Sequence, residues 1–192
     1  MTLRPVLTTL AAFVVVFGFQ TLVGFVGIGT VAFALALPLG HQPWTLLTSV
    51  YAHSTLGHLI ANTLALAIIG PFVAYLTSPI RFHAFFVTTG VLAGVAQVVL
   101  TVPLGGSAVI GASGAIFALL GYLVVGNRAS EVAISWLPLG RRGRLALFAA
   151  LAALVTITTA APGVALVAHF VGFLFGAIAG QARLLHTRRT GH

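Results

Sequence analysis

One apolar stretch, AHFVGFLFGAIAG at residues 168–180, repeats glycine every fourth residue, at Gly172, Gly176 and Gly180. This spacing places the three glycines on one face of a helix, where the lack of side chains allows a second helix to approach closely. The string Gly-Ala-Ser-Gly at 111–114 opens another apolar run. We expect these two helices to pack together and to bring Ser113 and His169 into contact.

The composition predicts an integral membrane protein. The 192 residues are 59% hydrophobic and 5% charged, with a mean hydropathy of +1.14, which is too apolar for a domain with a water-facing surface. A span needs roughly 20 mostly apolar residues. We therefore expect residues 1–192 to form one all-α polytopic membrane domain with six spans, near 5–24, 57–76, 82–100, 112–126, 145–160 and 163–184.

The basic residues predict how the spans are oriented. Every one of them is Arg, and all fall before the first span, between the second and third, between the fourth and fifth, or at and beyond the end of the sixth, at positions 4, 81, 128, 141, 142, 144, 183, 188 and 189. By the positive-inside rule, both termini are cytoplasmic and the Arg-free loops face outward. This topology predicts a multi-pass protein of the cell membrane.

Two segments have competing interpretations. Arg4 followed by an apolar run resembles a signal peptide, but the run is longer than the ~7–15 residues of such a segment, so we expect a retained first helix. The first outer loop, about 25–56, is too apolar to be solvated, and we expect short helices in the outer leaflet with Trp44 and Tyr51 at headgroup level. A seventh span is the alternative there.

Several classes of function are disfavoured. The chain lacks the basic and aromatic interleaving of a nucleic-acid surface, so we expect no nucleic-acid partner. It contains no cysteine, which excludes disulfides and thiolate metal sites. A metal held by His53, His58 and His169 is conceivable, but it would have no carboxylate or thiolate ligand. We expect neither a metal nor a cofactor.

Four polar residues from three predicted spans share one depth near the outer face. Ser113 begins the fourth span, His169 lies about 9 Å along the sixth if that span begins at Gly163, and His58 and Asn62 occupy one face of the second. A neutral imidazole can activate a serine hydroxyl. The chain has no Asp, and its single acid, Glu131, is predicted on the cytoplasmic side, so any serine chemistry here uses a Ser-His dyad.

An acyl intermediate also needs donors for its oxyanion. The candidates are the backbone N–H of Ser113, the Asn62 amide and the His58 ring. Each residue also has a structural interpretation, because small residues pack helices, and membrane His and Asn side chains hydrogen-bond between helices.

With these residues identified, the chain closely resembles the rhomboid family of intramembrane serine proteases. The resemblance runs from about 43 to 180 and rests on His53, His58 and Asn62, on Gly111-Ala112-Ser113-Gly114, and on Ala168-His169 with the glycines that follow. It implies a six-helix core, with Ser113 as nucleophile and His169 as general base. It further implies His58 and Asn62 as oxyanion donors, with Gly111 in the same binding region, and single-span membrane proteins as substrates, cut near their outer ends.

Two positions depart from the family pattern. Thr45 stands where members often have Arg after Trp, and Phe117 stands where many have a Tyr that stacks on the catalytic His. Phe117 can still stack on the His ring, but it lacks the hydroxyl with which Tyr forms a hydrogen bond. A non-catalytic membrane-protein binder and a small polytopic transporter are the rival functions, although a transporter would place polar groups through the whole membrane depth.

Overall fold

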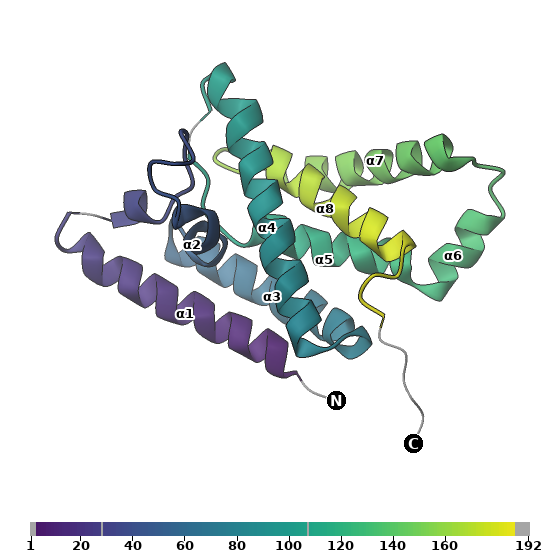
Figure 1. Cartoon of the computed structure of the whole chain (residues 1–192), viewed down its shortest axis with the longest axis horizontal. Helices are drawn as coiled ribbons and strands as arrows, with labels where there is room; N and C mark the ends of the chain where they lie inside the picture. The colour runs from purple at the N-terminus through teal and green to yellow at the C-terminus, as the bar shows by residue number, and fades with distance from the viewer. Residues whose placement is uncertain (1–2, 28, 107, 187–192) are drawn as a thin grey trace.

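The computed structural model describes residues 3–27, 29–106 and 108–186, and in this part of the chain it is helical, with no strand. Arg188 and Arg189 lie outside the described residues. Two short 3₁₀ turns, η1 (Gly29–Ala32) and η2 (Val102–Leu104), accompany the α-helices (Figure 1). These are α1 (Arg4–Gly24), α2 (Thr45–Tyr51), α3 (Leu56–Leu76), α4 (Pro79–Thr101), α5 (Ser113–Gly126), α6 (Arg128–Ser135), α7 (Arg141–Thr158) and α8 (Leu166–Gln181).

Side-chain caps fix where three of the helices begin. The Thr55 hydroxyl accepts the backbone N–H of His58 at the start of α3, and Ser78 accepts that of Arg81 at the start of α4. Asn127 accepts the N–H of Ser130 and separates α5 from α6. Each cap satisfies an N–H that the first helical turn leaves without a partner.

Helices occupy all six predicted span regions, but they differ in length and polarity. Three of them, α1, α3 and α4, are long and apolar enough to cross a membrane. A fourth candidate arises if α5 and α6, which meet at 59°, count as one broken span. α8 is a shorter apolar helix of 16 residues, and α7 begins with three Arg residues in its first four positions. Six spans therefore stay a prediction.

The first loop is folded against the bundle. It contains η1 and α2. Within it, the Trp44 indole N–H donates to the Ala32 carbonyl at 2.9 Å. Leu35 exchanges two backbone hydrogen bonds with Val109, just before α5. Among the described residues between α1 and α3, no helix is long enough to span a membrane. The alternative of a seventh span in this loop is therefore wrong.

α5 and α8 lie in the middle of the bundle and touch through their backbones (Figure 1). A Cβ atom at Gly172 would overlap the carbonyl oxygen of Gly114, and one at Gly176 would overlap that of Ala118. At Gly180, a Cβ would lie 2.7 Å from the Tyr122 carbonyl oxygen. The prediction that the glycines of 168–180 pack this helix against the one beginning at Ser113 is confirmed.

The start of α8 differs from the expectation. Gly163 belongs to a turn, in which Val164 donates its N–H to the Ala161 carbonyl, and the helix begins only at Leu166. His169 is thus three residues into the helix, or about 4.5 Å along it. The predicted depth of about 9 Å was wrong because it counted turn residues as helix.

The outer surface of the bundle is apolar. Val15 on α1 is 69% exposed and Ile68 on α3 is 66% exposed, and both belong to rows of similarly exposed aliphatic side chains. Apolar surface of this extent is costly in water and favourable in lipid. Together with the spanning helices, it assigns the protein to a membrane.

Replacing Gly176 with Ala should destabilise the protein, because the new methyl group would force α5 and α8 apart. Overpacking of this kind costs about 1–3 kcal/mol, and we expect the midpoint of thermal unfolding in detergent to fall by several degrees. Gly18→Ala on α1 is the matched control, since nothing lies within 4 Å of that Cβ position. An equal midpoint for both variants would contradict the glycine contact.

Candidate active site

A cavity of about 830 Å³ opens among α3, α4, α5 and the segment that joins α7 to α8. It contains four of the predicted site residues, which are Ser113, His169, His58 and Asn62. The structure therefore brings together, from three helices, the residues that the sequence placed at a common depth. Other polar side chains that line it are Ser54, Gln97, Thr101 and Thr159.

Ser113 is the first residue of α5, where the N–H groups of the opening helical turn lack intrahelical acceptors. The strand-like segment before it is fixed twice, by the Leu35–Val109 pair and by the Gly111 N–H, which donates to the Ser49 carbonyl at 2.8 Å. Gly111 has φ +127°, which side-chain-bearing residues rarely adopt, and a Cβ there would lie 2.7 Å from His58 Nε2. Position 111 therefore needs glycine for two reasons: its positive φ, and the lack of room for a Cβ atom beside the His58 ring.

His169 is buried and held on two sides. Its ring stacks on Phe117, with centroids 4.1 Å apart and planes at 17°, and its Nδ1 lies 3.1 Å from the Thr159 hydroxyl. Phe117 follows Ser113 by one helical turn, about 6 Å along α5. Because residues four apart share a helix face, the imidazole lies over the face of α5 that also carries Ser113.

The backbone next to His169 is also anchored. The Ala168 N–H donates to the Gln97 side-chain oxygen at 3.0 Å, which ties the first turn of α8 to α4. Within the described part of the chain, Ser113 Oγ makes no direct hydrogen bond to the His169 ring. Catalytic hydrogen bonds are often longer in the absence of substrate and tighten when it binds.

His58 and Asn62 face the cavity from successive turns of α3. His58 Nδ1 lies 3.1 Å from the Ser54 hydroxyl, and the Asn62 amide donates to the His58 carbonyl at 2.9 Å. An amide nitrogen has two protons, so Asn62 keeps a second N–H for a ligand. Both residues can thus present hydrogen-bond donors to a group bound beside Ser113.

His53 lies behind His58 and does not line the cavity. Its ring is fully buried, 5.2 Å from the His58 ring and 4.9 Å from that of Phe13. Burial, followed by repulsion from His58, lowers the pKa of His53 to about 4, so the ring is neutral at pH 7. Among the described residues, no group of three or more His, Asp or Glu side chains could hold a metal ion.

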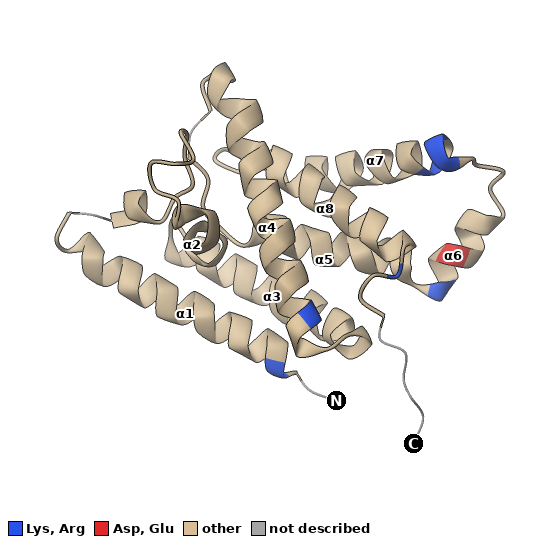
Figure 2. Ribbon diagram, in the orientation of Figure 1, with Lys and Arg blue, Asp and Glu red and all other residues tan. Residues whose placement is uncertain are grey.

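Glu131, the single acid of the chain, lies far from this site in sequence and in space. It belongs to α6 and forms an ion pair with Arg183, just beyond the end of α8. Among the described residues, the one acidic side chain lies on α6 (Figure 2) and is paired with Arg183, so it does not contact His169.

Three polar contacts were not found by sequence reasoning. The contact of Gln97 could have been predicted, because burying a Gln side chain within a membrane span costs free energy unless it is hydrogen-bonded. Gln20, whose amide exchanges two hydrogen bonds with the His53 backbone, gives the same signal. Thr159 gives none, since it follows α7 as an ordinary polar residue and meets His169 only through the turn that leads to α8.

The two departures from the family pattern have local explanations. Thr45 is buried, and its hydroxyl donates to the Gln42 carbonyl at 2.6 Å, so it closes the turn that leads into α2. Phe117 keeps the stacking contact with His169 without a hydroxyl. The expectation that stacking survives the change from Tyr to Phe is confirmed.

Comparison with known proteins gives the family. Among curated proteins, no sequence matches the chain significantly. The family model for the rhomboid domain matches residues 40–185, which include the whole cavity and every residue discussed above as a candidate for chemistry. That family consists mostly of intramembrane serine proteases and also has inactive members. The match covers well over half of the sequence, and the chain therefore belongs to the rhomboid family.

Proposed function

We propose that this protein is an intramembrane serine endopeptidase that cuts single-span membrane proteins near their outer ends. The observation that carries the proposal is the position of Ser113 and His169 in one cavity, over the same face of α5. A serine beside a buried, acid-free imidazole is suited to nucleophilic catalysis. The alternative explanation, helix packing, accounts for the glycines but not for two polar side chains facing a cavity.

In the proposed mechanism, Ser113 Oγ attacks the scissile carbonyl while His169 Nε2 takes the hydroxyl proton. The Oγ–C bond forms, and the carbonyl oxygen becomes an oxyanion that His58, Asn62 and the Ser113 N–H can stabilise. His169 then gives its proton to the leaving amine as the peptide bond breaks. Water, activated by the same imidazole, hydrolyses the acyl-enzyme and restores Ser113.

The substrate helix has to unwind before this chemistry, because a hydrogen-bonded helix keeps its carbonyls out of reach. Small or helix-breaking residues in the substrate should favour this step. The cavity lining includes residues of α3 and of the α7–α8 connection. An unwound segment and the water needed for hydrolysis could both reach Ser113 through this opening.

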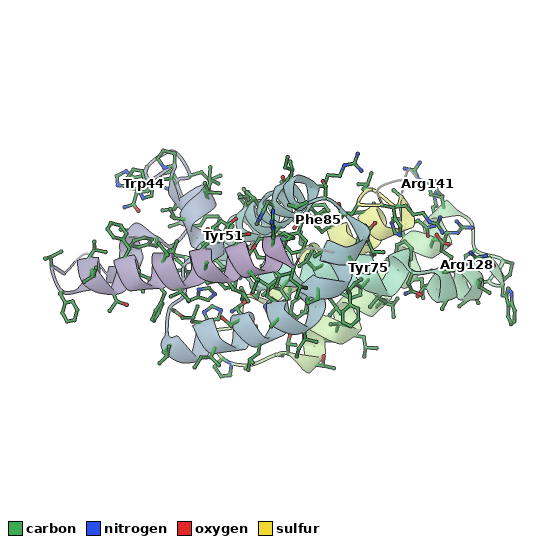
Figure 3. The ribbon with its side chains drawn as sticks, turned by 90° about the horizontal axis from the view of Figure 1, so that it is seen from below. Trp44, Tyr51, Tyr75, Phe85, Arg128 and Arg141 are labelled. Atoms are coloured by element: carbon green, nitrogen blue, oxygen red, sulfur yellow. The ribbon has the colours of Figure 1, made fainter. Side chains whose placement is uncertain are left out.

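The proposed topology puts both termini in the cytoplasm, with six spans and the cavity toward the outer face. Figure 2 supports it, since the described Arg residues lie at the starts of α1, α4, α6 and α7 and just after α8, at one end of the bundle. Figure 3 shows Trp44 at the end opposite to Arg128 and Arg141, as expected for an aromatic at the outer interface.

A non-catalytic binder with the same scaffold is the second candidate, because the family has inactive members. Such a protein has no need of a serine and an imidazole that line one cavity, and Ser113 and His169 do so here. A transporter is less well supported, because the polar cavity residues gather around one end of the helices.

Ser113→Ala and His169→Ala should each abolish cleavage of a single-span reporter reconstituted with the protein in liposomes. The first removes the nucleophile and the second removes its base. Ser135→Ala on α6 is the control, because its hydroxyl only bonds within that helix. Cleavage that persists in a folded Ser113→Ala protein would remove Ser113 from the mechanism.

Asn62→Ala should lower kcat by up to ~10²–10³-fold and leave KM nearly unchanged, because an oxyanion donor acts mainly in the transition state. A smaller loss is expected if His58 and the Ser113 N–H compensate. Steady-state kinetics on the same reporter measure the effect. Unchanged turnover would assign Asn62 a structural role, through its bond to the His58 carbonyl.

A further inference from the structure

The Thr159 side chain contacts two groups at once. Its Oγ1 lies 2.9 Å from the Thr156 carbonyl oxygen and 3.1 Å from Nδ1 of His169. Thr159 is the residue just after α7, so this contact also joins the end of α7 to α8.

Proton counting assigns the direction of both hydrogen bonds. A hydroxyl has one proton, and a carbonyl oxygen can only accept. If the hydroxyl donated to Nδ1, two oxygens with lone pairs would face each other at 2.9 Å. Both contacts are satisfied together only when Thr159 donates to Thr156 and accepts a proton from His169 Nδ1.

The tautomer of His169 follows from this arrangement. A neutral imidazole has one N–H, and placing it on Nδ1 leaves Nε2 with a free lone pair. Nε2 is the nitrogen that must accept the Ser113 proton. In proteases with a triad, a buried Asp gives the base this same tautomer. This chain has no Asp, and Glu131 is paired with Arg183.

We propose that Thr159 is a positioning residue that holds His169 as the Nδ1–H tautomer and so keeps Nε2 free to take the Ser113 proton. The catalytic consequence rests on the proposed function, whereas the tautomer is a property of the folded protein alone. A neutral hydroxyl orients the ring but carries no charge to stabilise the imidazolium formed during reaction. Its loss should therefore cost far less than the ~10⁴-fold that follows loss of a triad Asp.

The variants are chosen to isolate the hydroxyl. Thr159→Val keeps the shape and removes the acceptor, and Thr159→Ser restores the hydroxyl. Thr158→Val is the matched control, because the Thr158 hydroxyl also bonds back within α7, to the Val155 carbonyl at 2.7 Å, and has no contact with His169.

The primary measurement is ¹⁵N NMR of histidine side chains in the full-length protein in detergent, with the His169 signals assigned from their loss in His169→Ala. We expect a protonated Nδ1 and an unprotonated Nε2 in the wild type, in Thr159→Ser and in Thr158→Val. Thr159→Val should show a substantial Nε2–H population. A wild-type ring protonated on Nε2, or a Thr159→Val spectrum equal to that of the wild type, would overturn the proposal.

The second measurement is the rate of inactivation by a fluorophosphonate probe. Thr159→Val should lower the maximal rate of inactivation by about 3- to 10-fold, the effect of one neutral hydrogen bond, with an unchanged half-saturating probe concentration. Thr159→Ser should restore the rate. If the tautomer shifts in Thr159→Val but the rate does not, the tautomer assignment stands and its catalytic role is refuted. A wild type with the expected tautomer and no labelling would refute the proposed function and leave the tautomer assignment intact.

Discussion

Backbone contact between α5 and α8 constrains the rest of the structure. Gly172 and Gly176 lie so close to the carbonyls of Gly114 and Ala118 that no side chain fits between them. This contact fixes the distance between the helix that begins with Ser113 and the helix that carries His169. Three further helices pack on the pair: α4 contacts both α5 and α8, α3 contacts α5, and α7 contacts α8. The packing of these two helices thereby fixes how Ser113 and His169 are placed relative to each other.

A site of this kind suits a membrane, where charged groups are costly. Its ionisable groups are imidazoles, and the chain's single carboxylate lies instead in an ion pair at the Arg-rich end. The His169 ring is oriented by neutral contacts, the Phe117 face and the Thr159 hydroxyl. In the proposed mechanism, these contacts supply orientation, and the N–H donors around Ser113 supply the electrostatic stabilisation of the transition state.

The sequence predicted the parts of this structure that depend on local pattern. Glycine spacing identified the α5–α8 contact, and helical periodicity placed His58 and Asn62 on one face of α3. It failed at the start of α8, where the apolar residues Val164 and Ala165 belong to the turn after Pro162-Gly163 and not to the predicted helix. It also missed Thr159 and Gln97, since their partners lie 10 and 71 residues away along the chain and no spacing rule connects them.

The proposed activity depends most on the activation of Ser113 by the residues around it. Treatment of the purified wild-type protein with a fluorophosphonate, followed by mass-spectrometric mapping of every modified residue, tests this directly. We predict one adduct, on Ser113, and none on Ser54, which lines the same cavity but lies beside His58 rather than His169. No adduct on the folded protein, or one on Ser54 in place of Ser113, would contradict the account.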